Sequence, residues 1–208
     1  MSLRDHYEEL WQQLPPDLEP YDFALRRDFL LARVRPGERV LDVGCGEGVF
    51  AAELARAGAA VVGVDVAEEP LRRARRRHSQ LDLRVIDGER SWPLQDASFD
   101  VVWAGEVIEH VADTAAWLSE LRRVLRSGGR LLLSTPAHGR LSVIGLGLSR
   151  RAFARHFDPL ADHLRFYSRD TLTALLEQFR FESIAVRAAG GPPGARRLLL
   201  ASAIRGRF

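Results

Sequence analysis

The stretch from Val40 to Phe50 places a carboxylate beside three alternating glycines. Asp42 stands two residues before Gly44, and Gly46 and Gly48 follow at every second position. Because glycine has no Cβ and tolerates positive φ, such a turn predicts close approach of backbone N–H groups to a ligand. The spacing differs from the G-x-G-x-x-G of dinucleotide-binding turns, which disfavours a nicotinamide oxidoreductase. Taken alone, the glycines are also compatible with a tight strand-to-helix turn that binds nothing.

Two further carboxylates stand at the ends of later apolar runs. Asp65 ends the run 61–65, and Asp87 lies between Ile86 and Gly88. If these runs are strands of a parallel sheet, their carboxyl ends converge on the crevice where ligands bind. Three carboxylates there suit a ligand with a cationic amine, ribose hydroxyls and an exocyclic adenine N–H. Each Asp taken singly could instead be a helix N-cap or a turn residue.

A candidate acid–base group follows in Glu106, Glu109 and His110. On a helix, positions i, i+3 and i+4 share a face, so we expect the three side chains to converge. His110 could act as a general base, since its unperturbed pKa lies nearest neutrality. Alternatively, the three could bind a divalent cation that lowers the pKa of an acceptor hydroxyl, or Glu109 and His110 could simply order the loop. Mg²⁺ prefers oxygen ligands, so a divalent cation is not favoured and no metal ligand is assigned.

Composition and charge exclude several functions. The 208 residues include 30 basic and 28 acidic side chains, and none is lysine. The chain therefore has no Schiff-base nucleophile, phosphate-loop lysine or pyridoxal-phosphate anchor. The near balance of charge argues against a nucleic-acid partner, and the arginine-rich run 72–78 is expected to form a solvated helix face. A single cysteine, no signal-peptide pattern and no membrane-length apolar stretch predict a cytoplasmic protein without an integral membrane segment.

The elements that must position these residues follow from the hydrophobic pattern. From residue 39 onward, short apolar runs alternate with amphipathic segments, which predicts an α/β fold. We expect a Rossmann-like, mostly parallel seven-stranded sheet with helices on both faces and a C-terminal antiparallel hairpin. Strands are expected at 39–43, 60–65, 83–87, 99–104, 130–135, 181–188 and 197–204, and helices at 3–14, 21–34, 49–57, 70–77, 114–125 and 168–178.

The pattern predicts a single domain with four parts. Residues 1–36 form an N-terminal helical cap, 37–136 a cofactor-binding core, 137–168 a lid or acceptor insert, and 169–208 a C-terminal helix and hairpin. The insert is expected to be irregular. It carries three of the six histidines, His138, His156 and His163, which either contact an acceptor or pack the lid onto the sheet. Its apolar run 141–153 ends with two arginines and could enclose a hydrophobic acceptor or contact a membrane surface.

The stretch from Val40 to Phe50 resembles the first motif of class I S-adenosylmethionine-dependent methyltransferases, and later segments agree in order and spacing. Residues 98–103 resemble the family's fourth strand, 106–111 the helix that follows it, and 121–135 the approach to its fifth strand. Ser127 stands where many members have proline. The E-x-x-E-H pattern is similar to that of the ubiquinone-biosynthesis O-methyltransferases, where it implies metal binding.

This resemblance implies a cofactor, S-adenosyl-L-methionine, and a role for each predicted residue. Asp42 would lie near the methionine amine, and Asp65 would bind the ribose. The three loop glycines, Gly44, Gly46 and Gly48, would lie against the methionine and the ribose. Asp87 and Gly88 would contact the adenine, and Gly105 would line the pocket through its backbone. Arg26 or Arg27 could reach the methionine carboxylate. Tyr7, Trp11 and Tyr21 could close over the cofactor, although aromatic residues at helical spacing are more often core.

The expected activity is methyl transfer to a small-molecule acceptor, with a hydroxyl oxygen as the favoured atom on the strength of the resemblance. A nitrogen or carbon acceptor is an alternative. Another is a non-catalytic module that binds S-adenosylmethionine or S-adenosylhomocysteine and acts through a partner. The candidate acid–base group favours an enzyme, working as a monomer or homodimer.

Overall fold

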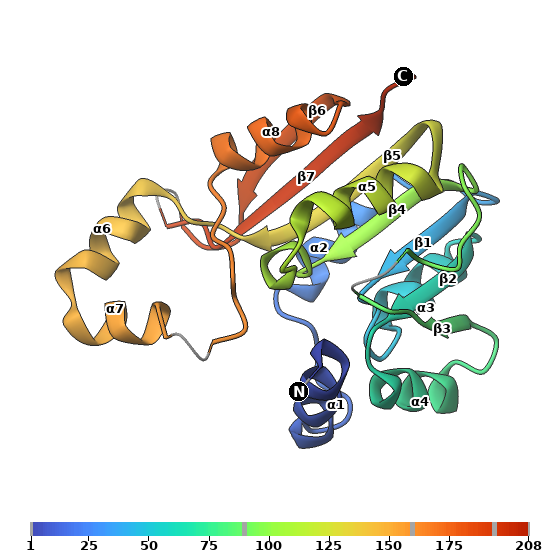
Figure 1. The fold of residues 1–208 in the computed structure, drawn as a ribbon, viewed down its shortest axis with the longest axis horizontal. Coiled ribbons are helices and arrows are strands. Elements are labelled where there is room, and N and C mark those ends of the chain that lie inside the picture. The colour runs from blue at the N-terminus through green and yellow to red at the C-terminus, as the bar shows by residue number, and fades with distance from the viewer. Residues whose placement is uncertain (1, 89–90, 159–160, 193–194, 208) are drawn as a thin grey trace.

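The computed structural model describes residues 2–88, 91–158, 161–192 and 195–207. Within them, seven strands form one sheet of order β3-β2-β1-β4-β5-β7-β6 (Figure 1). Neighbouring strands from β3 to β5 pair in parallel, whereas β7 runs antiparallel to both β5 and β6. The predicted fold class is confirmed. The strands are β1 (Arg39–Val43), β2 (Ala60–Asp65), β3 (Asp82–Val85), β4 (Phe99–Gly105), β5 (Leu125–Pro136), β6 (Phe181–Ala189) and β7 (Leu198–Arg205).

Helices cover both faces of this sheet, and their ends follow local sequence signals. The Asp113 carboxylate accepts a hydrogen bond from the Ala116 N–H, and Ser168 caps the last helix at the Thr171 N–H. The α-helices are α1 (Leu3–Gln13), α2 (Phe23–Leu31), α3 (Val49–Arg56), α4 (Glu68–Arg77), α5 (Thr114–Val124), α6 (Arg140–Leu148), α7 (Arg150–His156) and α8 (Arg169–Gln178), and a short 3₁₀ helix spans Ile108–His110.

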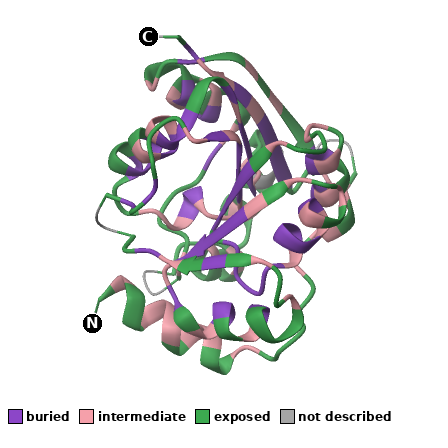
Figure 2. Ribbon diagram, turned by 90° about the vertical axis from the view of Figure 1, so that its right-hand side faces the viewer, coloured by how far each residue is buried: buried purple, intermediate pink, exposed green. Residues whose placement is uncertain are grey.

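Two apolar layers lie on opposite faces of the sheet because strand residues alternate between faces. Trp103 packs with Phe29 and Phe50, from α2 and α3, on one face. Val102, its neighbour along β4, packs on the other face with residues of α5 and α8, such as Leu118. Figure 2 shows buried residues concentrated in the central strands, whereas α1 contains none.

Three local expectations are wrong. The insert holds two helices, α6 and α7, rather than irregular chain. The third strand ends at Val85, two residues before Asp87. The segment from Glu106 to His110 is no α-helix, because Glu106 adopts a left-handed φ of 58° and only a 3₁₀ turn follows. Side chains in that segment therefore cannot share a face through α-helical spacing. Among the described residues, no helix is long and apolar enough to cross a membrane.

Candidate active site

The glycine loop links β1 to α3, and its backbone conformation requires glycine. Gly44, Gly46 and Gly48 have φ values of 66°, 52° and 74°, a region that L side chains disfavour. A Cβ on Gly44 would lie 2.5 Å from Cγ2 of Val107, and one on Gly46 would lie 3.1 Å from the Trp11 ring. The loop is therefore packed closely between the turn after β4 and helix α1.

Several N–H groups of this loop are already occupied by protein acceptors. Gly44 and Cys45 both donate to the Val64 carbonyl, and Gly46 donates to the Asp65 carboxylate at 2.9 Å. The sequence had suggested that the turn offers its backbone N–H groups to a ligand. In the structure, these three N–H groups instead hold the loop against β2. The glycines therefore provide space for a ligand rather than hydrogen-bond donors to it.

The predicted carboxylates differ strongly in burial. Asp42 is buried beneath the loop, and its Oδ2 atom has no hydrogen-bond partner. Burial raises the pKa of Asp42 to about 8, although the nearby Arg26 cation opposes the shift. Asp65 is also buried, and burial raises its pKa despite hydrogen bonds from the Gly46 and Ala67 N–H groups. Asp87, beyond the end of β3, is exposed.

A cavity of about 1150 Å³ lies at the carboxyl ends of β1 and β4. Six of the eleven predicted site residues line it, together with Arg26 and three histidines of the insert. They are Gly44, Gly46, Gly105, Glu106, Glu109 and His110, with His138, His156 and His163. Asp42, Gly48, Asp65, Asp87 and Gly88 are not part of the lining. A Cβ on Gly88 would lie 2.9 Å from the Leu3 side chain of α1, so α1 packs over that end of the crevice.

Glu106 and Glu109 enter the site from the turn after β4 and are held by β5. The Glu106 carboxylate accepts a hydrogen bond from the Ser134 hydroxyl at 2.8 Å, and Glu109 accepts one from the Thr135 hydroxyl at 2.9 Å. The second Glu109 oxygen, Oε1, is buried without a hydrogen-bond partner. Burial and the adjacent Glu106 charge raise the pKa of Glu109 to about 8. A proton is therefore retained on this pair near neutral pH.

His110 is fixed in one tautomer by the insert. Its Nδ1 lies 3.0 Å from the Asp162 carbonyl oxygen. A carbonyl can only accept, so Nδ1 carries the proton in the neutral ring and Nε2 keeps its lone pair. Burial and the neighbouring His163 lower the pKa of His110. The ring is consequently neutral at pH 7, with an unprotonated nitrogen, as a general base requires.

Arg26, not Arg27, reaches the cavity. Its buried guanidinium donates to the Ser134 hydroxyl at 3.1 Å and to the Tyr21 carbonyl at 3.2 Å. It also lies 4.7 Å from the centre of the Phe50 ring. Arg27 points away and pairs with Asp28 on the surface. The sequence alone does not show which of the two arginines reaches the cofactor, because they are adjacent and only packing decides which one faces inward.

His163 joins the acid–base group, which sequence spacing could not show. Ligand atoms of Glu109, His110 and His163 all lie within 4.8 Å of one another. This trio differs from the predicted Glu106, Glu109 and His110, because Glu106 turns toward Ser134. One carboxylate and two imidazoles suit a transition metal better than Mg²⁺. The same three groups also suit proton transfer without a metal.

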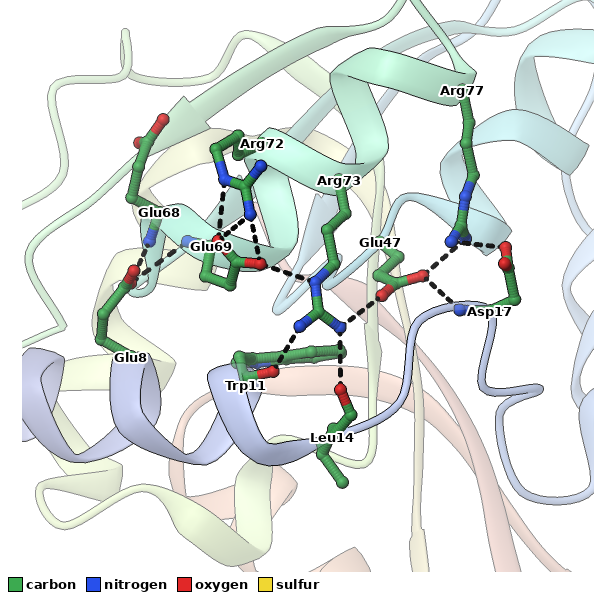
Figure 3. Close-up of polar contacts among 10 residues, drawn as sticks. All are labelled: Glu8, Trp11, Leu14, Asp17, Glu47, Glu68, Glu69, Arg72, Arg73 and Arg77. Atoms are coloured by element: carbon green, nitrogen blue, oxygen red, sulfur yellow. Dashed lines mark hydrogen bonds and ion pairs between the residues drawn. The ribbon is translucent and has the colours of Figure 1, made fainter.

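Helix α1 is fastened over the crevice by arginines of α4 (Figure 3). Arg73 donates to the Trp11 carbonyl at 2.8 Å, to the Leu14 carbonyl at 3.1 Å and to the Glu47 carboxylate at 3.1 Å. In return, Glu8 accepts hydrogen bonds from the first N–H groups of α4. The arginine run of α4 was expected to be a solvated face. Arg73 is instead largely buried and links two helices to the glycine loop.

Comparison with known proteins agrees with this architecture. Residues 41–133 match the family described as a methyltransferase domain. The ubiquinone biosynthesis O-methyltransferase of Xanthomonas campestris pv. campestris (strain B100) is 43% identical over 131 residues, which cover 58% of this chain and 54% of that protein. An uncharacterized 37.1 kDa protein in a transposon of Streptomyces fradiae is 41% identical over 128 residues, covering 59% of this chain and 37% of the other. The matched region thus spans about half or less of these relatives.

A solved structure gives the same fold. Phosphoethanolamine N-methyltransferase 2 of Haemonchus contortus, in complex with S-adenosyl-L-methionine, superposes with a TM-score of 0.75 at 18% identity, covering 100% of this chain and 60% of that one. At this identity the likeness supports the fold alone. The family match over residues 41–133 agrees with the sheet order and with the glycine loop after β1, and over that region the chain is similar to class I S-adenosylmethionine-dependent methyltransferases.

Proposed function

We propose that this chain is an enzyme that transfers a methyl group from S-adenosylmethionine to a hydroxyl oxygen of a small molecule. The observation that carries the proposal is His110, which faces the cavity as a neutral ring with Nε2 unprotonated. A hydroxyl acceptor must lose a proton during methylation, and this nitrogen can receive it. The name of the Xanthomonas relative, an O-methyltransferase, supports an oxygen acceptor.

The residues below the cavity fit the cofactor. Asp42 offers a buried oxygen without a partner, which suits the ammonium group of the methionine part. Arg26 provides a buried cation for the methionine carboxylate. Each Asp65 oxygen already accepts one N–H but can accept a second hydrogen bond, as ribose hydroxyls would supply. Asp87 and Gly88, beneath α1, are assigned to the adenine, and Gly105 to the methionine side of the pocket.

When bound, S-adenosylmethionine supplies an electrophilic methyl group on a sulfonium, whose departure leaves a neutral thioether. The residues of this chain then have three tasks. His110 accepts the acceptor proton at Nε2, and the carboxyl group of Glu109, whose Oε1 lies 4.0 Å from that nitrogen, stabilises the resulting imidazolium. The aromatic and apolar walls, including Trp11 and Leu146, exclude water from the cavity. Alignment of donor and acceptor supplies much of the remaining rate.

Calorimetric titration with S-adenosylmethionine and S-adenosylhomocysteine tests the cofactor assignment. We expect micromolar affinity that Asp65→Ala abolishes, because the ribose hydroxyls lose their acceptor. Folded protein that binds neither compound would contradict the proposal. A panel of phenols, catechols and amines then identifies the acceptor, and a chain that binds the cofactor yet methylates none of them would point to a non-catalytic module.

His110→Gln separates the base from the other roles. Glutamine can still donate to the Asp162 carbonyl but cannot accept a proton, so turnover should fall about 100-fold or more while cofactor affinity is kept. Unchanged turnover would remove His110 as the base. A chelator distinguishes the metal alternative, because activity that survives complete chelation leaves no role for an ion at Glu109, His110 and His163.

A further inference from the structure

Helices α6 and α7 form an arm that stands apart from the sheet (Figure 1). Large apolar side chains on this arm face solvent. Leu148 is 85% exposed, Ile144 57% and Phe153 50%. Val143 and Phe157 are also exposed. A group of this kind on two consecutive helices marks an interaction surface, because isolated domains rarely leave so many apolar side chains in water.

The apolar residues do not serve the cavity, since other positions of the same helices do. Leu146 of α6, and Ala152 and His156 of α7, line the cavity. On α7 the inward pair is spaced i, i+4, and the exposed Phe153 and Phe157 form a second pair with ring centroids 4.6 Å apart. The arm therefore has an inner face toward the site and an outer face whose apolar side chains are largely exposed. Of these side chains, Phe157 also contacts the Phe166 ring, with ring centroids 5.3 Å apart.

The charge of the arm is of one sign. Residues 138–157 contain Arg140, Arg150, Arg151 and Arg155 and no acidic residue, and all four arginines are exposed. Elsewhere in the chain basic and acidic residues nearly balance. An amphipathic helix with apolar and cationic side chains suits an anionic lipid surface, where the apolar groups enter the acyl boundary and the arginines meet the headgroups.

We propose that the outer face of the arm, residues 140–157, docks on an anionic membrane surface. The charge argues against a second copy as the occupant. A symmetric dimer through this face would bring the four arginines of each copy together, whereas lipid phosphates neutralise them. Because the inner face of the arm is a wall of the cavity, docking places the cavity next to the bilayer.

Vesicle sedimentation tests the docking without cofactor or acceptor, so its outcome is independent of the proposed function. The protein should pellet with vesicles of equimolar phosphatidylglycerol and phosphatidylcholine, bind phosphatidylcholine alone weakly, and dissociate as salt is added. The double variant Arg150→Gln/Arg151→Gln should lower partitioning about 30-fold, from the contribution of each arginine near an anionic surface.

Two matched variants make the test specific. Arg76→Gln/Arg169→Gln removes the same charge from exposed positions of α4 and α8 and should leave partitioning within about twofold. Ile144→Ser/Leu148→Ser removes apolar groups without changing charge and should reduce binding more than tenfold. Because all six positions are exposed, the fold should be retained, which unfolding curves check.

Three results would overturn the proposal. The protein could remain in the supernatant with the anionic vesicles. The control pair could reduce binding as much as the arm pair, which would indicate a general charge effect. Sedimentation velocity could reveal a dimer that Ile144→Ser/Leu148→Ser dissociates, with no vesicle binding, which would assign the face to a second copy.

Discussion

Replacement of Arg26 by methionine tests how the cavity recognises the methionine end of the cofactor. Methionine keeps the length and apolar packing of the side chain but removes the hydrogen bonds to the Ser134 hydroxyl and the Tyr21 carbonyl. A hydrogen bond to a charged group contributes about 1.5–3 kcal/mol, which corresponds to a roughly 10- to 150-fold loss of affinity for S-adenosylhomocysteine. Arg27→Met, which removes a surface pair with Asp28 and a cation–π contact with Phe23, should leave affinity unchanged.

The assay is calorimetry with two ligands that differ in the group concerned. S-adenosylhomocysteine carries the carboxylate, whereas methylthioadenosine has the same nucleoside without it. Arg26→Met should weaken the first ligand and spare the second. Loss of the two internal hydrogen bonds should also lower the free energy of unfolding by about 1–3 kcal/mol, so binding is measured well below the unfolding transition. Equal weakening of both ligands would show that Arg26 only supports the fold, and unchanged affinity for both would refute the assignment.

Three further predictions concern the glycine loop, the buried carboxyl and the α1 contact. Gly44→Ala should cost about 1–3 kcal/mol of stability in urea unfolding, because φ is 66° and the new Cβ meets Val107; Val107→Ala should restore part of it, and a silent substitution would contradict the geometry. The pKa of Glu109 is raised to about 8, so between the ordinary pKa of a glutamate and pH 8 the folded state holds a proton that the unfolded state releases. The free energy of unfolding should therefore fall by up to about 1.4 kcal/mol per pH unit as the pH rises through this range. Measured at several pH values, this free energy should depend less steeply on pH in Glu109→Gln, and an equal dependence in both proteins would contradict the raised pKa. Arg73→Gln should speed hydrogen exchange in α1 by removing the donors to its last carbonyls, whereas Arg72→Gln, whose partner Glu69 lies on its own helix, should not; equal exchange in both would exclude the contact.

Most of the fold could be predicted from local patterns. The boundaries of β1 and β2 agree with the expected ones, and the last helix begins after the cap at Ser168, as the sequence indicated. Apolar alternation and helix caps are encoded within a few residues, so neighbouring sequence suffices to recognise them. The insert was misjudged because the glycines and polar residues of α6 and α7 interrupt the helical periodicity.

The candidate site was predicted in part. The residues of the glycine loop and of the turn after β4 could be predicted because the members of each motif lie within a few positions of one another in the sequence. The predicted α-helical face of Glu106, Glu109 and His110 was wrong, since the left-handed backbone at Glu106 breaks the spacing. Those residues nevertheless line one cavity, because β4 delivers the whole turn to the carboxyl edge of the sheet.

By itself, the sequence determined which residue types stand at the ends of the strands, and hence the parallel sheet, the glycine-bearing crevice and the supply of carboxylates. Only the tertiary structure decided which of them meet. In the folded chain Arg26 rather than Arg27 reaches the cavity, His163 lies beside Glu109 although more than fifty residues separate them in the sequence, and Arg73 is buried against α1. Such pairings depend on how whole helices and the insert pack against the sheet, and no local pattern records that packing.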